Sequence, residues 1–235
     1  MNPATQVQVE QLVQAVRQMH EAIRHRVVSA CETRSVEDLS EVTECSSSET
    51  DTIYRIDRVG EQELLDFVAA EISCLTPVMV IGEGIKDGCV VCPEGTPASK
   101  VHWRIIVDPI DGTRGLMFQK RSAWILTGIA RNCGGATSLG DIEAAVQTEI
   151  PLVKQHLCDQ LWAVRGQGAQ GVRWNRCTGE SSSLKIAPSQ AVNFLHGYAT
   201  VCRFFPGARD VLAAIDDELA TRLLGPRKTG DAHIF

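Results

Sequence analysis

Two aspartates follow an apolar run in the middle of the chain. Asp108 and Asp111 stand three positions apart in VHWRIIVDPIDGTRG, residues 101–115. The β-branched residues before them are typical of a buried strand, and open sheets commonly bind ligands at the carboxyl ends of strands. Because Pro109 disfavours helical backbone at Asp108, we expect the chain to turn there. Both carboxylates and the Ile110 carbonyl would then point to one spot.

Oxygen donors of this kind suit Mg²⁺, which prefers carboxylate, carbonyl and water ligands. Gly112 and Thr113 follow at once and would open a helix, whose unpaired N–H groups attract phosphate. A second interpretation stays open at this point. Asp-Pro and Asp-Gly are also ordinary turn dipeptides, and Asp111 would then only cap the helix.

A third acidic residue has a similar position. Glu83 ends the segment PVMVIGE, residues 77–83, and stands between Gly82 and Gly84. The segment is expected to form a compact apolar strand, which places Glu83 at a strand exit, as expected for Asp108. The alternative is that Glu83 is only a turn residue.

Several elements must position these side chains. Residues 31–50 are polar and rich in Ser, Glu and Thr, which predicts a mobile loop. The segment DTIYRID then leads into a helix that starts near Asp57, a suitable N-cap. Strands are expected at 122–130 and 141–150, followed by a hairpin at GQGAQG and a helix at 208–224. Apolar residues at three- and four-residue steps predict a long N-terminal helix with a core-facing stripe of Val9, Leu12, Val13, Val16, Met19, Ile23 and Val27.

Composition excludes several classes of partner. The 235 residues carry a net charge of -6 and no basic stripe, which argues against binding to a nucleic-acid polymer. We find neither a signal peptide nor an apolar run of membrane-spanning length. The nine scattered cysteines indicate reduced thiols and a cytoplasmic protein. An acidic chain of this kind would bind a phosphate ester through a divalent cation, which inverts the local field.

The segment DPIDGT after an apolar strand, the upstream VIGE and the downstream LWAVRGQGAQG together resemble the inositol monophosphatase family. Its members are Mg²⁺-dependent, lithium-sensitive phosphatases. The resemblance covers nearly all of the chain. It implies an α/β layered sandwich of the αβαβα type, hydrolysis of an inositol monophosphate-like ester, two or three Mg²⁺ ions and a homodimer. Relatives suggest 3′(2′),5′-bisphosphate nucleotidase or fructose-1,6-bisphosphatase activity as alternatives.

The resemblance also implies a set of metal ligands. Glu83, Asp108 and the Ile110 carbonyl correspond to ligands of the first metal. Asp108 and Asp111 correspond to ligands of the second.

The catalytic and phosphate-binding groups follow by the same correspondence. Asp57 ends DTIYRID, which is similar to the family motif D-L-V-T-x-x-D. With Thr113 it would orient the attacking water. The backbone N–H groups of Gly112 and Thr113 would hold the phosphate.

The chain departs from the family pattern in several places. Gly84 stands where a second acidic residue is usual, Tyr54 replaces a threonine, and Gly115 and Leu116 follow where Asn-Phe is common. The family's later W-D-x-A-A motif has no counterpart after Asp111. We therefore expect a C-terminally shortened member, with an N-terminal part at 1–150 that carries the motifs and a partial C-terminal subdomain at 151–235. A competing hypothesis is a non-catalytic remnant that binds metal or phosphate.

Overall fold

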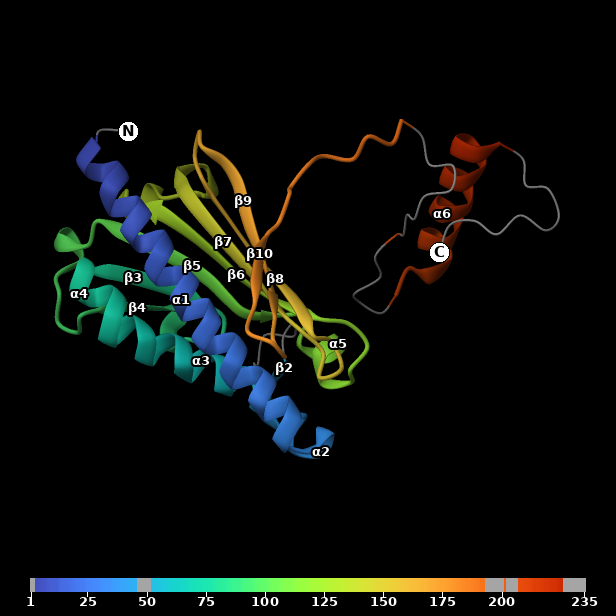
Figure 1. Ribbon diagram of the computed structural model, residues 1–235, viewed down its shortest axis with the longest axis horizontal. Coiled ribbons are helices and arrows are strands. Elements are labelled where there is room, and N and C mark those ends of the chain that lie inside the picture. The colour runs from blue at the N-terminus through green and yellow to red at the C-terminus, as the bar shows by residue number, and fades with distance from the viewer. Residues whose placement is uncertain (1–2, 46–51, 193–200, 202–206, 226–235) are drawn as a thin grey trace. The chain divides into compact units, whose positions relative to one another are not determined.

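The computed structural model describes residues 3–45, 52–192, 201 and 207–225 of the chain (Figure 1). The chain divides into two compact units, residues 1–186 and 187–235. The first unit contains helices and an eight-stranded sheet. In the second unit the described residues include one helix, α6 (Arg209–Leu224), which confirms the helix expected there.

The remaining elements belong to the first unit. Its α-helices are α1 (Pro3–Thr33), α2 (Val36–Leu39), α3 (Arg55–Phe67), α4 (Ser73–Leu75) and α5 (Thr113–Met117). A π-helical segment at Val68–Ile72 connects α3 to α4. Its strands are β1 (Val42–Cys45), β2 (Thr52–Tyr54), β3 (Val78–Gly82), β4 (Cys89–Cys92), β5 (Trp103–Asp111), β6 (Ala123–Arg131), β7 (Ile142–Ile150), β8 (Leu157–Val164), β9 (Gly168–Asn175) and β10 (Ser181–Ser183). Short 3₁₀ turns occupy Lys86–Gly88, Ala98–Lys100, Gly134–Ala136 and Leu139–Asp141.

The large sheet has the strand order β10-β9-β8-β7-β6-β5-β3-β4. Strands β3 and β5 are parallel, and the other neighbouring pairs are antiparallel. The expected strands at 77–83, 122–130 and 141–150 are confirmed as β3, β6 and β7. The hairpin expected at GQGAQG is confirmed as β8–β9. Strands β1 and β2 form a separate antiparallel pair.

Helix α1 confirms the predicted amphipathic helix. All seven residues of its expected stripe are 5% exposed or less. The stripe packs on α3 and on strands β6, β7 and β8, and Figure 1 shows α1 and α3 along one face of the sheet. The spacing of the apolar residues therefore identifies the face of the helix that contacts the sheet.

Strand β5 differs from the expectation at the aspartates. It continues past Asp108 to Asp111, so the turn comes after Asp111 and not at Asp108. The pairing with β6 shifts between Asp108↔Leu126 and Asp111↔Trp124, where three residues advance on β5 against two on β6. Pro109 has no N–H to donate to a neighbouring strand, and a β-bulge accommodates it without ending the strand.

Within the polar segment expected to be a mobile loop, residues 31–45 form regular elements. Helix α1 continues to Thr33, and α2 and β1 follow. The Ser35 hydroxyl accepts a hydrogen bond of 3.2 Å from the Asp38 N–H and so caps α2. A polar composition that predicts a loop is therefore also compatible with a short capped helix. The last residues of this segment, 46–50, lie outside the described part.

The division expected after residue 150 stays a prediction. Strands β7 and β8, which lie on either side of it, pair within the same sheet. Among the helices that the structure describes, none combines the length and apolar character needed to cross a membrane.

A buried polar network joins α1 to the sheet. The two ring nitrogens of His20 form hydrogen bonds with the hydroxyls of Thr148, at 2.9 Å, and Thr127, at 2.7 Å. The Gln160 amide donates to the Thr148 hydroxyl and to the Arg17 carbonyl. Burial, together with the nearby charge of Arg24, lowers the pKa of His20 from 6.5 to about 3. The imidazole is therefore neutral in the folded protein at neutral pH.

The low pKa of His20 predicts that the folded protein loses stability in acid. In the unfolded chain His20 binds a proton below about pH 6.5, whereas in the folded chain it does so only near pH 3. Stability should therefore fall as the pH drops through this window, by about 2 kcal/mol between pH 7 and pH 5. Urea unfolding of the wild type and His20→Gln at both pH values measures the difference. His25→Gln, on the exposed face of the same helix, is the control. Equal pH dependence in the wild type and His20→Gln would contradict the prediction.

Candidate functional site

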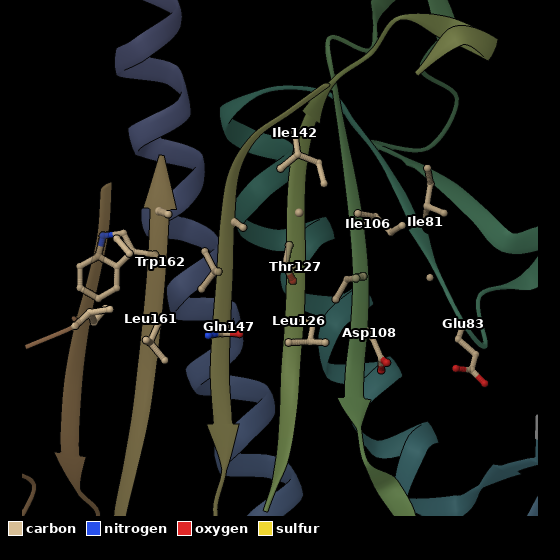
Figure 2. Close-up of a pocket in the computed structure, with 18 residues that line it drawn as sticks. Ile81, Glu83, Ile106, Asp108, Leu126, Thr127, Ile142, Gln147, Leu161 and Trp162 are labelled. Atoms are coloured by element: carbon tan, nitrogen blue, oxygen red, sulfur yellow. The ribbon is translucent and has the colours of Figure 1, made fainter. Parts of the chain in front are cut away.

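Strands β3 and β5 place two carboxylates toward the same end of the sheet. Gly82, the last residue of β3, pairs with Val107, so Glu83 and Asp108 follow two paired residues of parallel neighbours. Both line a cavity of about 760 Å³ whose other lining residues are mostly apolar. Figure 2 shows the two carboxylates at the same end of the strands, on the face away from the helices. Glu83 follows the end of β3 as expected, whereas Asp108 lies within β5, three residues before its end.

The Asp108 carboxylate also shapes the bulge. Its Oδ1 accepts a hydrogen bond of 3.0 Å from the Ile110 N–H, across Pro109. This bond closes a local turn of the Asx type and fixes the carboxylate against its own backbone. Asp111, at the end of β5, is exposed and does not line the cavity.

Asp57 connects the start of α3 to the turn after β5. Its Oδ2 accepts a hydrogen bond of 2.8 Å from the Tyr54 N–H. The Thr113 hydroxyl lies 2.8 Å from Asp57 Oδ1 and 2.9 Å from the Ile110 carbonyl oxygen. Since the hydroxyl has one proton for these two acceptors, its lone pairs remain available to a further donor.

The role expected for Asp57 as an N-cap is wrong. Helix α3 begins at Arg55, and its N-cap is Tyr54. Asp57 is the third helical residue, and its carboxylate reaches back to the N–H of the cap, as the acidic residue of a capping box does. The helix begins two residues earlier than expected, and this shift leaves Asp57 Oδ1 directed at Thr113.

Burial raises the pKa of Asp57. Desolvation raises the pKa of its carboxyl above the ordinary value, against hydrogen bonds from Tyr54 and Thr113 and the positive charges of Arg58 and Arg114. A carboxyl with a raised pKa is a better proton acceptor near neutral pH than an ordinary aspartate. The Asp57–Thr113 pair therefore has the form of a hydroxyl held beside a base.

Gly112 makes the turn from β5 into α5. Its φ of 95° lies in the left-handed region, which favours glycine. A Cβ here would also lie 3.3 Å from Nη2 of Arg121, so the guanidinium occupies space that a side chain would need. The predicted opening of a helix at Gly112 and Thr113 is confirmed, although α5 has only five residues.

Two cations near this turn were missed in the sequence. Arg114 donates a hydrogen bond of 3.0 Å to the Tyr54 hydroxyl, and its guanidinium carbon lies 5.8 Å from the Tyr54 ring centroid. Arg121 lies against Gly112 and Gly115. The sequence does show basic residues in RGLMFQKR, directly after the Asp-Gly-Thr motif. Only the fold shows that the Arg121 side chain lies next to Gly112.

The donor set fits Mg²⁺ in chemistry, because it consists of carboxylate and carbonyl oxygens. Across the described residues, however, no group of three or more His, Cys, Asp or Glu side chains gathers closely enough to hold a metal ion. Mg²⁺ commonly uses one or two carboxylates and completes its shell with water and substrate phosphate. Glu83 and Asp108 fit that sparse mode of binding. In the part of the chain that the structure describes, these side chains do not form a complete cage of protein ligands.

Comparison with known proteins identifies the fold. No protein-family model matches the sequence, and no curated protein matches it significantly. The structure is similar to fructose-1,6-bisphosphatase from Leishmania major in its holo form, with a TM-score of 0.55 and 13% identity over 75% of this chain and 53% of that one. It is also similar to 2′-AMP-bound SaIMPase-II, with a TM-score of 0.52 and 16% identity over 94% of this chain and 65% of that one.

A third similar structure is an inositol monophosphatase-fructose 1,6-bisphosphatase, with a TM-score of 0.50 and 17% identity over 77% of this chain and 56% of that one. The chain thus spans between about half and two thirds of the lengths of these proteins. The α/β layered fold expected from the sequence is confirmed by these likenesses. At such identities they show the fold alone.

Removal of the Thr113 hydroxyl is expected to destabilise the folded protein. Thr113→Val has nearly the same shape but leaves Asp57 Oδ1 and the Ile110 carbonyl without this donor. We expect the free energy of unfolding to fall by about 1–2 kcal/mol, as for other buried acceptors that lose a partner. Thr113→Ser keeps the hydroxyl and should cost less. Urea denaturation measures both, and equal losses in the two variants would show that the hydroxyl is not the stabilising group.

Proposed function

We propose that this protein hydrolyses a small phosphate monoester of the inositol monophosphate kind, with Mg²⁺ as cofactor. The observation that carries the proposal is the Asp57–Thr113 hydrogen bond, which lies at the turn that directly follows Asp108 and Asp111. The likeness of the fold to sugar phosphatases supports the same conclusion.

The residues that would hold the metal are those of the strand ends. Glu83, Asp108 and the Ile110 carbonyl would bind one ion, and Asp108 and Asp111 a second. When bound, Mg²⁺ supplies acidification of water and neutralisation of phosphate charge. Because the chain has a net charge of -6, a cation is also needed for an anionic substrate to approach these carboxylates.

Asp57 and Thr113 would orient the attacking water. The Thr113 hydroxyl directs its proton to Asp57 or to the Ile110 carbonyl, so its oxygen can accept a hydrogen bond from water. The raised pKa of Asp57 favours temporary uptake of a proton through that hydroxyl. The two side chains thus hold a water and provide a route for its proton.

The turn after β5 would hold the phosphate. The N–H groups of Gly112 and Thr113 offer donors, and the guanidinium of Arg121 adds positive charge beside Gly112. Arg114, fixed on Tyr54, adds a second charge nearby. Phosphoryl transfer depends mainly on such positioning and charge neutralisation.

A second candidate function is binding of metal or phosphate without turnover. It is favoured by the lack, within the described ranges, of any cluster of three acidic ligands. Calorimetric Mg²⁺ binding without phosphate release from any ester would favour this candidate. Within the enzyme class, a panel of inositol 1-phosphate, 3′-phosphoadenosine 5′-phosphate and fructose 1,6-bisphosphate distinguishes the proposed activity from the nucleotidase and bisphosphatase alternatives.

The proposal predicts phosphate release that requires Mg²⁺, stops with a chelator and is inhibited by Li⁺. Asp111→Asn should lower the rate at least about 100-fold, because it removes a carboxylate ligand of the second metal ion. The measurement is release of inorganic phosphate from the ester panel.

Asp87→Asn is the matched control for this variant. It makes the same change of charge in an exposed turn where φ is 60°, a conformation that asparagine tolerates. It should keep wild-type activity. Activity that persists in EDTA, or that survives Asp111→Asn, would contradict the proposed mechanism.

A further inference from the structure

An ion pair on the first turns of α3 lies against the residue that follows Glu83. Nη1 of Arg58 donates a hydrogen bond of 2.6 Å to Oε2 of Glu61 and one of 3.2 Å to the Gly84 carbonyl oxygen. Glu61 is only 7% exposed. The pair therefore connects the helix that carries Asp57 to the turn that carries Glu83.

The lack of a side chain at Gly84 leaves room for the Glu61 carboxylate. Its φ is 77°, and a Cβ at this position would lie 1.8 Å from Oε1 of Glu61. Real side chains do not approach so closely, so the Glu61 carboxylate fills the space that a side chain at position 84 would occupy. The turn is thus held by a hydrogen bond to its carbonyl and by close packing on its α-carbon.

Arg58 also acts on the other half of the site. It follows Asp57 in the sequence, and its positive charge is one of the influences that lower the pKa of that carboxyl. A single guanidinium therefore interacts with Asp57 and with the turn after β3.

The Glu61 side chain is 9% exposed and that of Arg58 is 32% exposed, so the carboxylate, more than the guanidinium, carries a cost of burial. An apolar pair of similar volume can fill such a space with equal or better stability, because charges lose hydration on burial. An apolar pair cannot donate a directional hydrogen bond to the Gly84 carbonyl. Only the charged pair can therefore fix the position of the turn through a hydrogen bond to its backbone.

We propose that Arg58 and Glu61 are positioning residues that fix the Glu83 carboxylate for metal binding. The inference rests on the proposed function, since it treats Glu83 as a ligand. Supporting residues of this kind orient metal ligands, and their loss typically weakens metal affinity about 10–100-fold.

The main test replaces both residues together. Arg58→Met with Glu61→Leu keeps the volume and leaves the net charge unchanged, so general attraction of Mg²⁺ to the site is preserved. In the full chain we expect Mg²⁺ affinity, measured by calorimetry, to fall about 10-fold or more. The urea midpoint without metal should stay close to that of the wild type. Arg58→Lys keeps a donor and a charge and should recover part of the affinity.

Two glycines give a matched comparison. Gly84→Ala places a methyl group where the Glu61 carboxylate lies, whereas Gly88→Ala imposes similar backbone strain, at a φ of 74°, with no neighbouring atom within 4 Å. Gly84→Ala should weaken Mg²⁺ binding and Gly88→Ala should not. In a Glu61→Ala background the space is open, so Gly84→Ala should have a smaller effect there.

The outcomes separate this inference from the proposed function. If the wild type binds Mg²⁺ and the double replacement and Gly84→Ala bind it equally well, the positioning role is overturned while the proposed function stands. If the wild type binds no Mg²⁺, both are overturned. A loss of affinity in both variants, with the urea midpoint of the double replacement and the Gly88→Ala control preserved, supports the inference.

Discussion

The bridge made by the Asp57 carboxylate is the interaction on which the rest of the site depends. One oxygen accepts from the Tyr54 N–H at the start of α3, and the other meets the Thr113 hydroxyl at the start of α5. Two segments 56 positions apart in the sequence are thereby fixed at hydrogen-bond distance. The bridge is partly buried, so water competes for it less than at the surface. The hydrogen bond from Arg114 to the Tyr54 hydroxyl joins the same two elements from a more exposed position.

Local charge in this region differs from the charge of the whole chain. The protein is acidic overall, yet Arg58, Arg114 and Arg121 lie around the Asp57–Thr113 pair and Gly112. Glu83 and Asp108 lie at the neighbouring strand ends. Carboxylates suit a cation and arginines suit an anion, so under the proposed function the region would accept two ligands of opposite charge. Such an arrangement matches a phosphate that is bound with its metal better than either ion alone.

Much of the fold could be predicted from the sequence because its signals are periodic or local. The α1 stripe, the β3 strand and the glycine turn at Gly112 each depend on residues that are close in the chain. The bulge at Pro109 could not be predicted, since proline signals a break in a strand and a bulge equally well. The contact of Glu61 with Gly84 joins positions 23 apart, and nothing in either residue type indicates it. The candidate ligands, which stay a prediction, could be proposed from local motifs, whereas the neighbouring groups that contact their turns could not.

The sheet order has a consequence for how the chain reaches this structure. Strands β5 to β10 are neighbours in the sheet in the same order as in the sequence, so each can pair as soon as the next one is complete. Helix α1 is different, because His20 meets Thr148 across 128 positions. At ordinary rates of synthesis its apolar stripe waits on the order of ten seconds for its partner strands. Helix α3 packs on the same helix and is synthesised long before these strands, so it can cover part of the stripe during this interval.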